Sequence, residues 1–467
     1  MPNNISTAVS FAKQAAKLWD FAGIKRRLQV LQEIGSYLAD EKKNVCNLLL
    51  EEGFSQALAE DYFQWIAYAA NPNLLENYSR DLVKFVKTSN GKEIFVHRAD
   101  GVVIIYAQAG SPTFNAGPIF STLLPGNSVI LVRSPMMDKG LRFIVEQVIH
   151  PILEKNGFPK HLVTLVTEEY RDALAELISH PDVSDILGIG SNLDNANIQR
   201  QAHENNKKVI LEHYGRGYLV VWKDAQISSA VKSALRVLDL SGRPCFLPKQ
   251  FLIHQEVFDK FVGEFLQAIA MHARTIAADK VNGVLSPIMQ INSYLEAVNE
   301  LRQVGQIRCG GYQMDAEGIP DPSGLYASPT VAILEADVCL SRSIQCVDQE
   351  ILFPLIPLIR FNGDEKDIIT KMVKLIQKPP VGLRTSIWTS DLNVIEHFTR
   401  EIGAISMLRF NSDHSNSPFY ASFWGGGNGD NHLFWKKTTH LQAIDCNYLS
   451  DEQINSVLKG LGYTLLA

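Results

Sequence analysis

The chain has 467 residues, of which 46% are hydrophobic and 20% charged, and its formal net charge at pH 7 is −6. This composition is that of an ordinary globular protein, and the length predicts two or three domains rather than one core. Acidic and basic residues are mixed along the chain, which argues against a nucleic-acid-binding surface.

The cysteines and the N-terminus indicate the compartment. The six cysteines are scattered without C-x-x-C or Cys/His spacing, which argues against a zinc site and a disulfide framework and favours a reducing compartment. Met1-Pro2-Asn3-Asn4 lacks the pattern of a signal peptide, and no apolar run approaches the ~20 residues of a membrane span. We therefore expect a cytoplasmic protein with no metal and no membrane partner.

The N-terminal part is helical in pattern. Over residues 5–83, apolar side chains recur at steps of three and four. From about residue 83 the pattern becomes strand-like, with turns at Asn90-Gly91 and Asp100-Gly101. The three strands predicted there are 83–87, 93–97 and 102–106.

Short apolar strands then alternate with helical stretches as far as about residue 222. The predicted strands are 128–132, 163–166, 185–188, 208–211 and 218–221, and the helices include 115–124, 140–155 and 168–180. This alternation is typical of a parallel α/β sheet that binds a nucleotide at its strand ends. No G-x-G-x-x-G follows the first strand, so the standard dinucleotide fingerprint is absent.

The second half repeats the alternation. Its predicted elements are helices 226–238 and 258–276 and strands 250–254, 330–334, 355–361 and 385–389. The tail carries a strand at 438–444 and a helix at 450–461. We expect this late strand to join the early hairpin around residues 93–106 in a protruding arm.

Two residues suggest covalent catalysis. Cys245, in Leu240-Ser241-Gly242-Arg243-Pro244-Cys245-Phe246, follows Glu212, which ends an apolar strand before a glycine turn. A thiol can attack a carbonyl carbon, and a carboxylate can activate water or the thiol. Taken alone, each residue also fits a non-catalytic role: Cys245 as a buried structural thiol and Glu212 as a surface carboxylate.

Read in order, the motifs resemble those of the aldehyde dehydrogenase superfamily through nearly the whole chain. The segments that carry the resemblance are Gly101-Val102-Val103-Ile104-Ile105 leading to Pro112, Leu124-Pro125-Gly126-Asn127, Gly188-Ile189-Gly190-Ser191, Glu212-His213-Tyr214-Gly215-Arg216, Gly242-Arg243-Pro244-Cys245, Gln349-Glu350-Ile351-Leu352-Phe353-Pro354 and the glycine loop 425–427. No single segment is specific, but their order and spacing are.

The resemblance implies an α/β fold with three parts. These are a Rossmann-like cofactor-binding domain (1–88 and 107–213), an α/β catalytic domain (214–436) and a β oligomerisation arm (89–106 and 437–467). Because a β arm is costly to leave unpaired, we expect a homodimer or homotetramer.

The resemblance also implies roles for particular residues. Cys245 would attack a small-molecule aldehyde, and Glu212 would act as the base. NAD or NADP would accept the hydride, held by Gly190 and Ser191 at its phosphates and by Glu350 at a ribose. Arg133 could attract the 2′-phosphate of NADP. Water, or coenzyme A as a co-substrate, would release the resulting thioester.

Several positions depart from the family pattern. Gly110 replaces the asparagine whose amide stabilises the oxyanion, and Val132 and Pro135 replace a lysine and an acidic residue. Asn195 and Tyr214 stand where the family has glycine. These departures leave two alternatives open: a coenzyme A-acylating reductase, and a diverged, non-catalytic member of the family.

Overall fold

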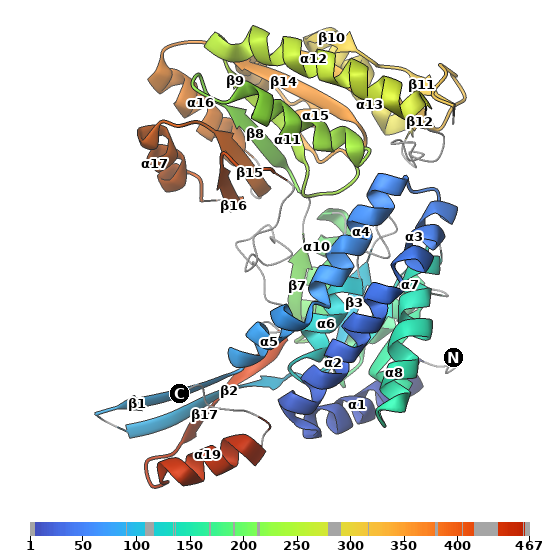
Figure 1. The fold of residues 1–467 in the computed structure, drawn as a ribbon, viewed down its shortest axis with the longest axis vertical. Coiled ribbons are helices and arrows are strands. Elements are labelled where there is room, and N and C mark those ends of the chain that lie inside the picture. The colour runs from blue at the N-terminus through green and yellow to red at the C-terminus, as the bar shows by residue number, and fades with distance from the viewer. Residues whose placement is uncertain are drawn as a thin grey trace. The chain divides into compact units, whose positions relative to one another are not determined.

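The computed structural model divides into two compact units (Figure 1). Unit 1 comprises Met1–Glu52, Glu60–Glu212 and Leu433–Ala467, and unit 2 comprises Gly53–Ala59 and His213–His432. The residues that the structure describes are 5–89, 91–107, 116–133, 135, 137–167, 170–189, 192–212, 215–278, 291–315, 317–378, 382–403, 405–414, 438–460 and 462.

The N-terminal helices form because their apolar residues recur at helical spacing. The buried Trp19 and Arg27 attach the first two to a later helix: Trp19 Nε1 donates to the Leu123 carbonyl at 2.7 Å, and Arg27 Nε donates to the Leu124 carbonyl at 2.9 Å. These helices are α1 (Ile5–Phe21), α2 (Gly23–Asp40), α3 (Lys42–Glu51), α4 (Gln56–Ala69), α5 (Pro72–Arg80) and α6 (Gly117–Leu123).

Unit 1 is built on a parallel sheet with the order β5-β4-β3-β6-β7 in the described residues. Its strands are β3 (Val102–Ala107), β4 (Ser128–Val132), β5 (Val163–Val166), β6 (Val183–Ile189) and β7 (Lys208–Glu212). Numbered along the chain, this order is 3-2-1-4-5, that of a dinucleotide-binding fold, with the switch point between β3 and β6. The α/β architecture predicted for this region is confirmed.

Helices cover both faces of this sheet. One apolar core joins α1, α9 and α10 to residues of β3, β4 and β6. Because crossovers between parallel strands are right-handed as a rule, we expect α6, which packs on β4, and the α7–α8 segment, which packs on β5, to cover the other face. The helix predicted at 140–155 contains a π-helical stretch just before Pro151, which has no N–H to continue an α-helix. These elements are α7 (Lys139–Phe143), η2 (Ile144–Ile149), α8 (His150–Lys155), η3 (Lys160–Leu162), α9 (Tyr170–Ser179) and α10 (Asn192–Glu204).

A second sheet in unit 1 is antiparallel, with the order β1-β2-β17 (Figure 1). Strands β1 (Val83–Thr88) and β17 (Thr439–Asp445) flank β2 (Gly91–Ala99), and α19 (Asp451–Gly460) follows. The late strand therefore pairs with the early hairpin as expected. Residues 102–106, which the sequence grouped with the arm, lie instead in the five-stranded sheet as β3, because their side chains are buried on both faces.

Unit 2 is built on a sheet with the order β10-β13-β14-β9-β8-β15-β16 in the described residues, parallel except for β10. A small hairpin of β11 and β12 accompanies it. The strands are β8 (Gly217–Val221), β9 (Pro248–His254), β10 (Gln306–Cys309), β11 (Gln313–Met314), β12 (Tyr326–Ala327), β13 (Thr330–Glu335), β14 (Leu355–Phe361), β15 (Gly382–Trp388) and β16 (Ile405–Phe410).

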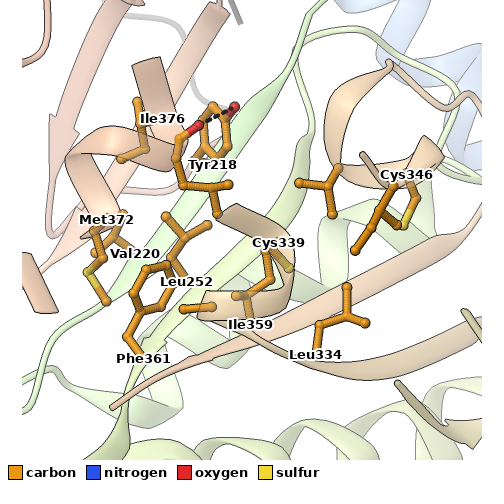
Figure 2. Packing of buried hydrophobic residues seen from close by; sticks show 14 of the residues in the cluster. Tyr218, Val220, Leu252, Leu334, Cys339, Cys346, Ile359, Phe361, Met372 and Ile376 are labelled. Atoms are coloured by element: carbon orange, nitrogen blue, oxygen red, sulfur yellow. Dashed lines mark hydrogen bonds between the residues drawn. The ribbon is translucent and has the colours of Figure 1, made fainter. Parts of the chain in front are cut away.

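One large apolar core lies on one face of this sheet (Figure 2). Tyr218, Val220 and Leu252 point into it from β8 and β9, where they meet Met372 and Ile376 of α16. The alternate residue Phe251 packs on the other face, against two phenylalanines of α12. The helices of unit 2 are α11 (Ile227–Asp239), α12 (Gln255–Ala278), α13 (Ile291–Val304), α14 (Ala336–Ser341), α15 (Gln345–Asp348), α16 (Glu365–Gln377) and α17 (Leu392–Glu401). Within the described residues, no helix has the length and apolar character needed to cross a bilayer.

A buried carboxyl lies where the two sheets of unit 1 meet. Asp185, 1% exposed at the start of β6, lies near Asp100 and 3.9 Å from Lys208 Nζ. Lys208 also pairs with Asp100 and donates to the Thr439 carbonyl of β17 at 3.1 Å. Burial, followed by the charge of Asp100, raises the pKa of Asp185 to about 8.

This raised pKa makes the stability of the protein depend on pH. The folded state binds the Asp185 proton more tightly than the unfolded state, so the free energy of unfolding falls as pH rises from about 4 to about 8. We expect Asp185→Asn to be more stable than the wild type at pH 8, by about 1–3 kcal/mol, and the difference to vanish near pH 4. Urea unfolding at several pH values measures this.

The matched control is Asp182→Asn, which removes an exposed carboxylate paired with Lys13. That pairing lowers the pKa of Asp182, so its small contribution is present at neutral pH and lost on acidification. An Asp185→Asn protein less stable than the wild type at pH 8 would contradict the assignment.

Candidate active site

The residues singled out by the sequence in unit 2 lie at one edge of its sheet. Cys245 lies just before β9, Gly215 and Arg216 just before β8, and Glu350 just before β14. These strands are neighbours in the order β14-β9-β8 and run parallel. Because neighbouring parallel strands begin at the same edge of a sheet, the three segments converge there.

The 242–245 turn carries Cys245 and follows the C-terminal end of α11. The Ser241 N–H donates to the Leu238 carbonyl at 2.9 Å, and the Gly242 N–H donates to the Val237 carbonyl at 2.7 Å. These are the two hydrogen bonds of a Schellman helix end, and Ser241 (φ 54°) and Gly242 (φ 64°) are both left-handed. A Cβ on Gly242 would lie 2.3 Å from the Phe353 carbonyl oxygen, so only glycine fits here.

Gly215 packs directly on Cys245. A Cβ at position 215 would lie 1.8 Å from the Cys245 carbonyl oxygen and 2.9 Å from the Cys245 Cβ. Cys245 is partly exposed, whereas Cys46, Cys339 and Cys346 are buried and burial raises the pKa of each of their thiols. Cys245 thus has the access that a reactive thiol needs.

Glu350 carries a buried acceptor atom. No described group donates a hydrogen bond to its Oε1, although the backbone N–H of Gly215 donates to the carboxyl group. Burial raises the pKa of Glu350 to about 8, and the charges of Lys249 and Arg216 oppose this shift. A buried acceptor without a partner suits a ligand hydroxyl.

Sequence reasoning missed Lys249 and Gln250, which begin β9. Lys249 is 1% exposed and donates to the Gly242 carbonyl. Gln250 is fully buried, and its Nε2 donates to the Val347 carbonyl at 2.7 Å. Arg216 donates to the Asp348 carbonyl, so Gln250 and Arg216 together fix the segment before Glu350. The sequence feature that could have drawn attention to them is the presence of two polar residues at the start of the otherwise apolar run 248–254.

The site residues of unit 1 lie at the carboxyl ends of its strands. Glu212 is the last residue of β7 and pairs with Ile189 at the end of β6. Arg133 follows β4 and is 1% exposed; burial lowers its pKa to about 10, opposed by the charges of Asp138 and Glu52. Val132 is fully buried in the sheet core.

Other expected site residues lie outside the described residues. These are Gly110, Gly190, Ser191, Tyr214, the glycine loop 425–427 and the side chains of Glu212 and Asn195. Cys245 and Glu350 belong to unit 2, while Glu212 and Arg133 belong to unit 1.

The close packing at Gly215 predicts the effect of a small substitution. In Gly215→Ala the new methyl group would overlap backbone atoms of Cys245, which cannot rotate away. We expect a loss of about 1–3 kcal/mol in stability and, through displacement of Cys245, about a 100-fold loss of any turnover that depends on it. The control is Gly263→Ala in α12, whose methyl group meets open space, with an expected gain of about 0.5–1 kcal/mol. Wild-type turnover and stability in Gly215→Ala would contradict the packing.

Comparison with known proteins identifies the family. The family model described as "Aldehyde dehydrogenase family" matches residues 2–432. A D-glyceraldehyde dehydrogenase (NADP(+)) of Thermoplasma acidophilum is 24% identical over 434 residues, which are 89% of this chain and 81% of that protein. The lactaldehyde dehydrogenase of Escherichia coli is 24% identical over 446 residues, 92% of this chain and 85% of that protein.

Solved structures show the same fold. The glyceraldehyde-3-phosphate dehydrogenase of Methanocaldococcus jannaschii complexed with NADP has a TM-score of 0.80 at 17% identity, covering 94% of this chain and 93% of that one. The Escherichia coli lactaldehyde dehydrogenase has a TM-score of 0.78 at 19% identity, covering 94% and 90%. The predicted fold and the predicted family are thus confirmed. Since the family model spans residues 2–432 of 467, the chain belongs to the aldehyde dehydrogenase family of enzymes.

Proposed function

We propose that this enzyme oxidises an aldehyde with NAD or NADP through a covalent intermediate on Cys245. The observation that carries the proposal is the convergence of Cys245, Gly215 and Glu350 at the amino edge of the unit 2 sheet. Family membership supplies the reaction class, and the partly exposed thiol supplies the nucleophile.

The proposed chemistry proceeds in three steps. The Cys245 thiolate attacks the aldehyde carbon, forming a C–S bond, and the carbonyl oxygen takes a proton to give a hemithioacetal. Loss of a hydride from that carbon and of the hydroxyl proton leaves a thioester. Water then attacks the thioester, Glu212 accepts the proton of the water, and cleavage of the C–S bond releases the acid and the thiolate.

NAD or NADP would supply the hydride acceptor when bound. A ribose hydroxyl would donate a hydrogen bond to the buried Oε1 of Glu350, which has no partner among the described residues. The strand order of unit 1 suits a nucleotide at the carboxyl ends of β3 and β6. We assign the pyrophosphate to Gly190 and Ser191, directly after β6, on the family resemblance alone.

The choice between NAD and NADP depends on the region after β4. The NADP(+) enzyme of Thermoplasma acidophilum and the NADP complex from Methanocaldococcus jannaschii favour NADP for this chain. Arg133 remains the proposed contact for a 2′-phosphate, but its 1% exposure and the nearby Asp138 and Glu52 equally suit a guanidinium that serves the fold. Turnover with each cofactor measures the preference directly.

The functional test is NAD(P)H formation by purified protein with an aldehyde panel, with and without coenzyme A. We expect turnover without coenzyme A and a loss of at least about 1,000-fold in Cys245→Ala. Glu212→Gln should lose about 100-fold or more in steady-state turnover yet retain one burst of NAD(P)H per site, because the thioester forms but is not hydrolysed.

Other outcomes favour the alternatives. Turnover only with coenzyme A would identify an acylating reaction. The proposed role of Glu212 argues against that outcome, because a base that activates water favours hydrolysis of the thioester. Absence of turnover in both conditions, with Cys245 still alkylated, would favour a diverged, non-catalytic protein. Undiminished turnover in Cys245→Ala would exclude the assigned nucleophile.

We also propose that the β1-β2-β17 sheet joins subunits in a homodimer or homotetramer. β17 is an edge strand, and Leu441 on it and Tyr448 after it are 57% and 97% exposed. We expect light scattering to give a dimer or tetramer, and Leu441→Lys to weaken association about tenfold or more. Leu392→Lys, at a leucine of α17 that is 76% exposed, is the control. A monomeric wild type would contradict the proposal.

The cytoplasmic location of the protein stays a prediction.

A further inference from the structure

A buried ammonium group contacts the turn that carries Cys245. Lys249 is the second residue of β9, is 1% exposed and donates to the carbonyl of Gly242, the residue that starts the 242–245 turn. A buried charge costs several kcal/mol unless it is compensated, and an apolar residue would satisfy the strand equally well. The packing of unit 2 therefore does not by itself explain a lysine here.

The charge of Lys249 is not neutralised by a contacting carboxylate. Among the described residues, no carboxylate oxygen lies within 4.0 Å of its Nζ, and its hydrogen bond goes to a neutral carbonyl. The groups whose charges favour the ammonium are Glu350 and Cys245. The charge of Lys249 therefore interacts with the thiol and with the carboxyl group on the two neighbouring segments.

Charged groups on the neighbouring elements complete the surroundings. Arg216, before β8, acts on Glu350 from the other side. His414 is fully buried; burial, Arg384, Arg409 and Lys249 all lower its pKa, so it is neutral and adds no competing positive charge. Lys249 is thus a buried cation of this edge whose charge interacts with both Cys245 and Glu350.

We propose that Lys249 is a positioning residue for the nucleophile, which holds the 242–245 turn through the Gly242 carbonyl and stabilises the thiolate of Cys245. The proposal deepens the function proposed above and rests on it for the use made of the thiolate. The thiol proton leaves to water, and Lys249 keeps its own proton during this step. Burial lowers the pKa of Lys249 to about 8, so this support fades as pH rises through about 8.

The test is the pH dependence of Cys245 alkylation by iodoacetamide, followed by peptide mass spectrometry. In the wild type we expect the half-maximal rate at a pH below the ~8.5 of an unperturbed thiol. Lys249→Met should raise this midpoint by about one unit and slow alkylation about tenfold at pH 7. Glu350→Gln should not slow alkylation at pH 7, because it leaves Lys249 and its hydrogen bond to Gly242 in place.

Controls separate this electrostatic effect from a loss of structure. Lys260→Met removes an exposed lysine of α12 and should leave the profile unchanged, and Cys309, also partly exposed, serves as an internal reference thiol. Circular dichroism checks folding, and Lys249→Arg, which keeps the charge, should restore the wild-type midpoint. If neither variant folds, the wild-type midpoint decides: a value at or above about 8.5 overturns the proposal.

Two further outcomes overturn it. If Lys249→Met slows alkylation by the same factor at every pH, Lys249 has a structural role only. The same conclusion holds if Glu350→Gln slows alkylation as much as Lys249→Met does. The turnover assay tests the proposed function separately. An active Cys245→Ala protein would exclude Cys245 as the nucleophile, while the alkylation profile would still decide the role of Lys249.

Discussion

The site depends on one close approach: the backbone of Gly215 lies against Cys245, with no room for even a methyl group between them. A second approach, of Gly242 to the Phe353 carbonyl, joins the Cys245 turn to the segment that carries Glu350. Both are possible because β8, β9 and β14 are adjacent parallel strands that begin at the same edge. Strand order thus converts three segments far apart in sequence into one constellation.

Electrostatics at this edge follow from the same packing. The convergence that brings Glu350 and Lys249 to this edge also buries Lys249 and the Oε1 of Glu350. Burial raises the pKa of the carboxyl group and lowers that of the amine. Burial brings the two pKa values toward each other, so the ionisation of both groups changes over one range of pH near 8. A thiol beside them experiences a local charge that is most positive below that range.

Much of this arrangement could be predicted from the sequence. The alternation of strands and helices predicted the parallel sheets, and the ordered motifs placed Cys245 and Glu350, which the structure brings together in unit 2. Lys249 was missed because its burial and its contact with Gly242 depend on which strands lie beside β9, and the polar start of the run 248–254 indicates neither. Residues 102–106 were grouped with the arm for a similar reason: a turn at Asp100-Gly101 looks like a hairpin, but burial on both faces draws the strand into the parallel sheet. Arg133 was proposed as a contact for a 2′-phosphate, and its burial could not be predicted from the sequence.

In the proposed mechanism, Cys245 carries the substrate as a thioester. The most direct measurement is acid quenching of the enzyme during turnover with an aldehyde and NADP or NAD, followed by mass spectrometry of the peptide that contains Cys245. We expect an acyl group on Cys245, so that the peptide gains the mass of the aldehyde less two hydrogens, and we expect this adduct to accumulate in Glu212→Gln. Turnover without such an adduct, or an adduct on another cysteine, would contradict it.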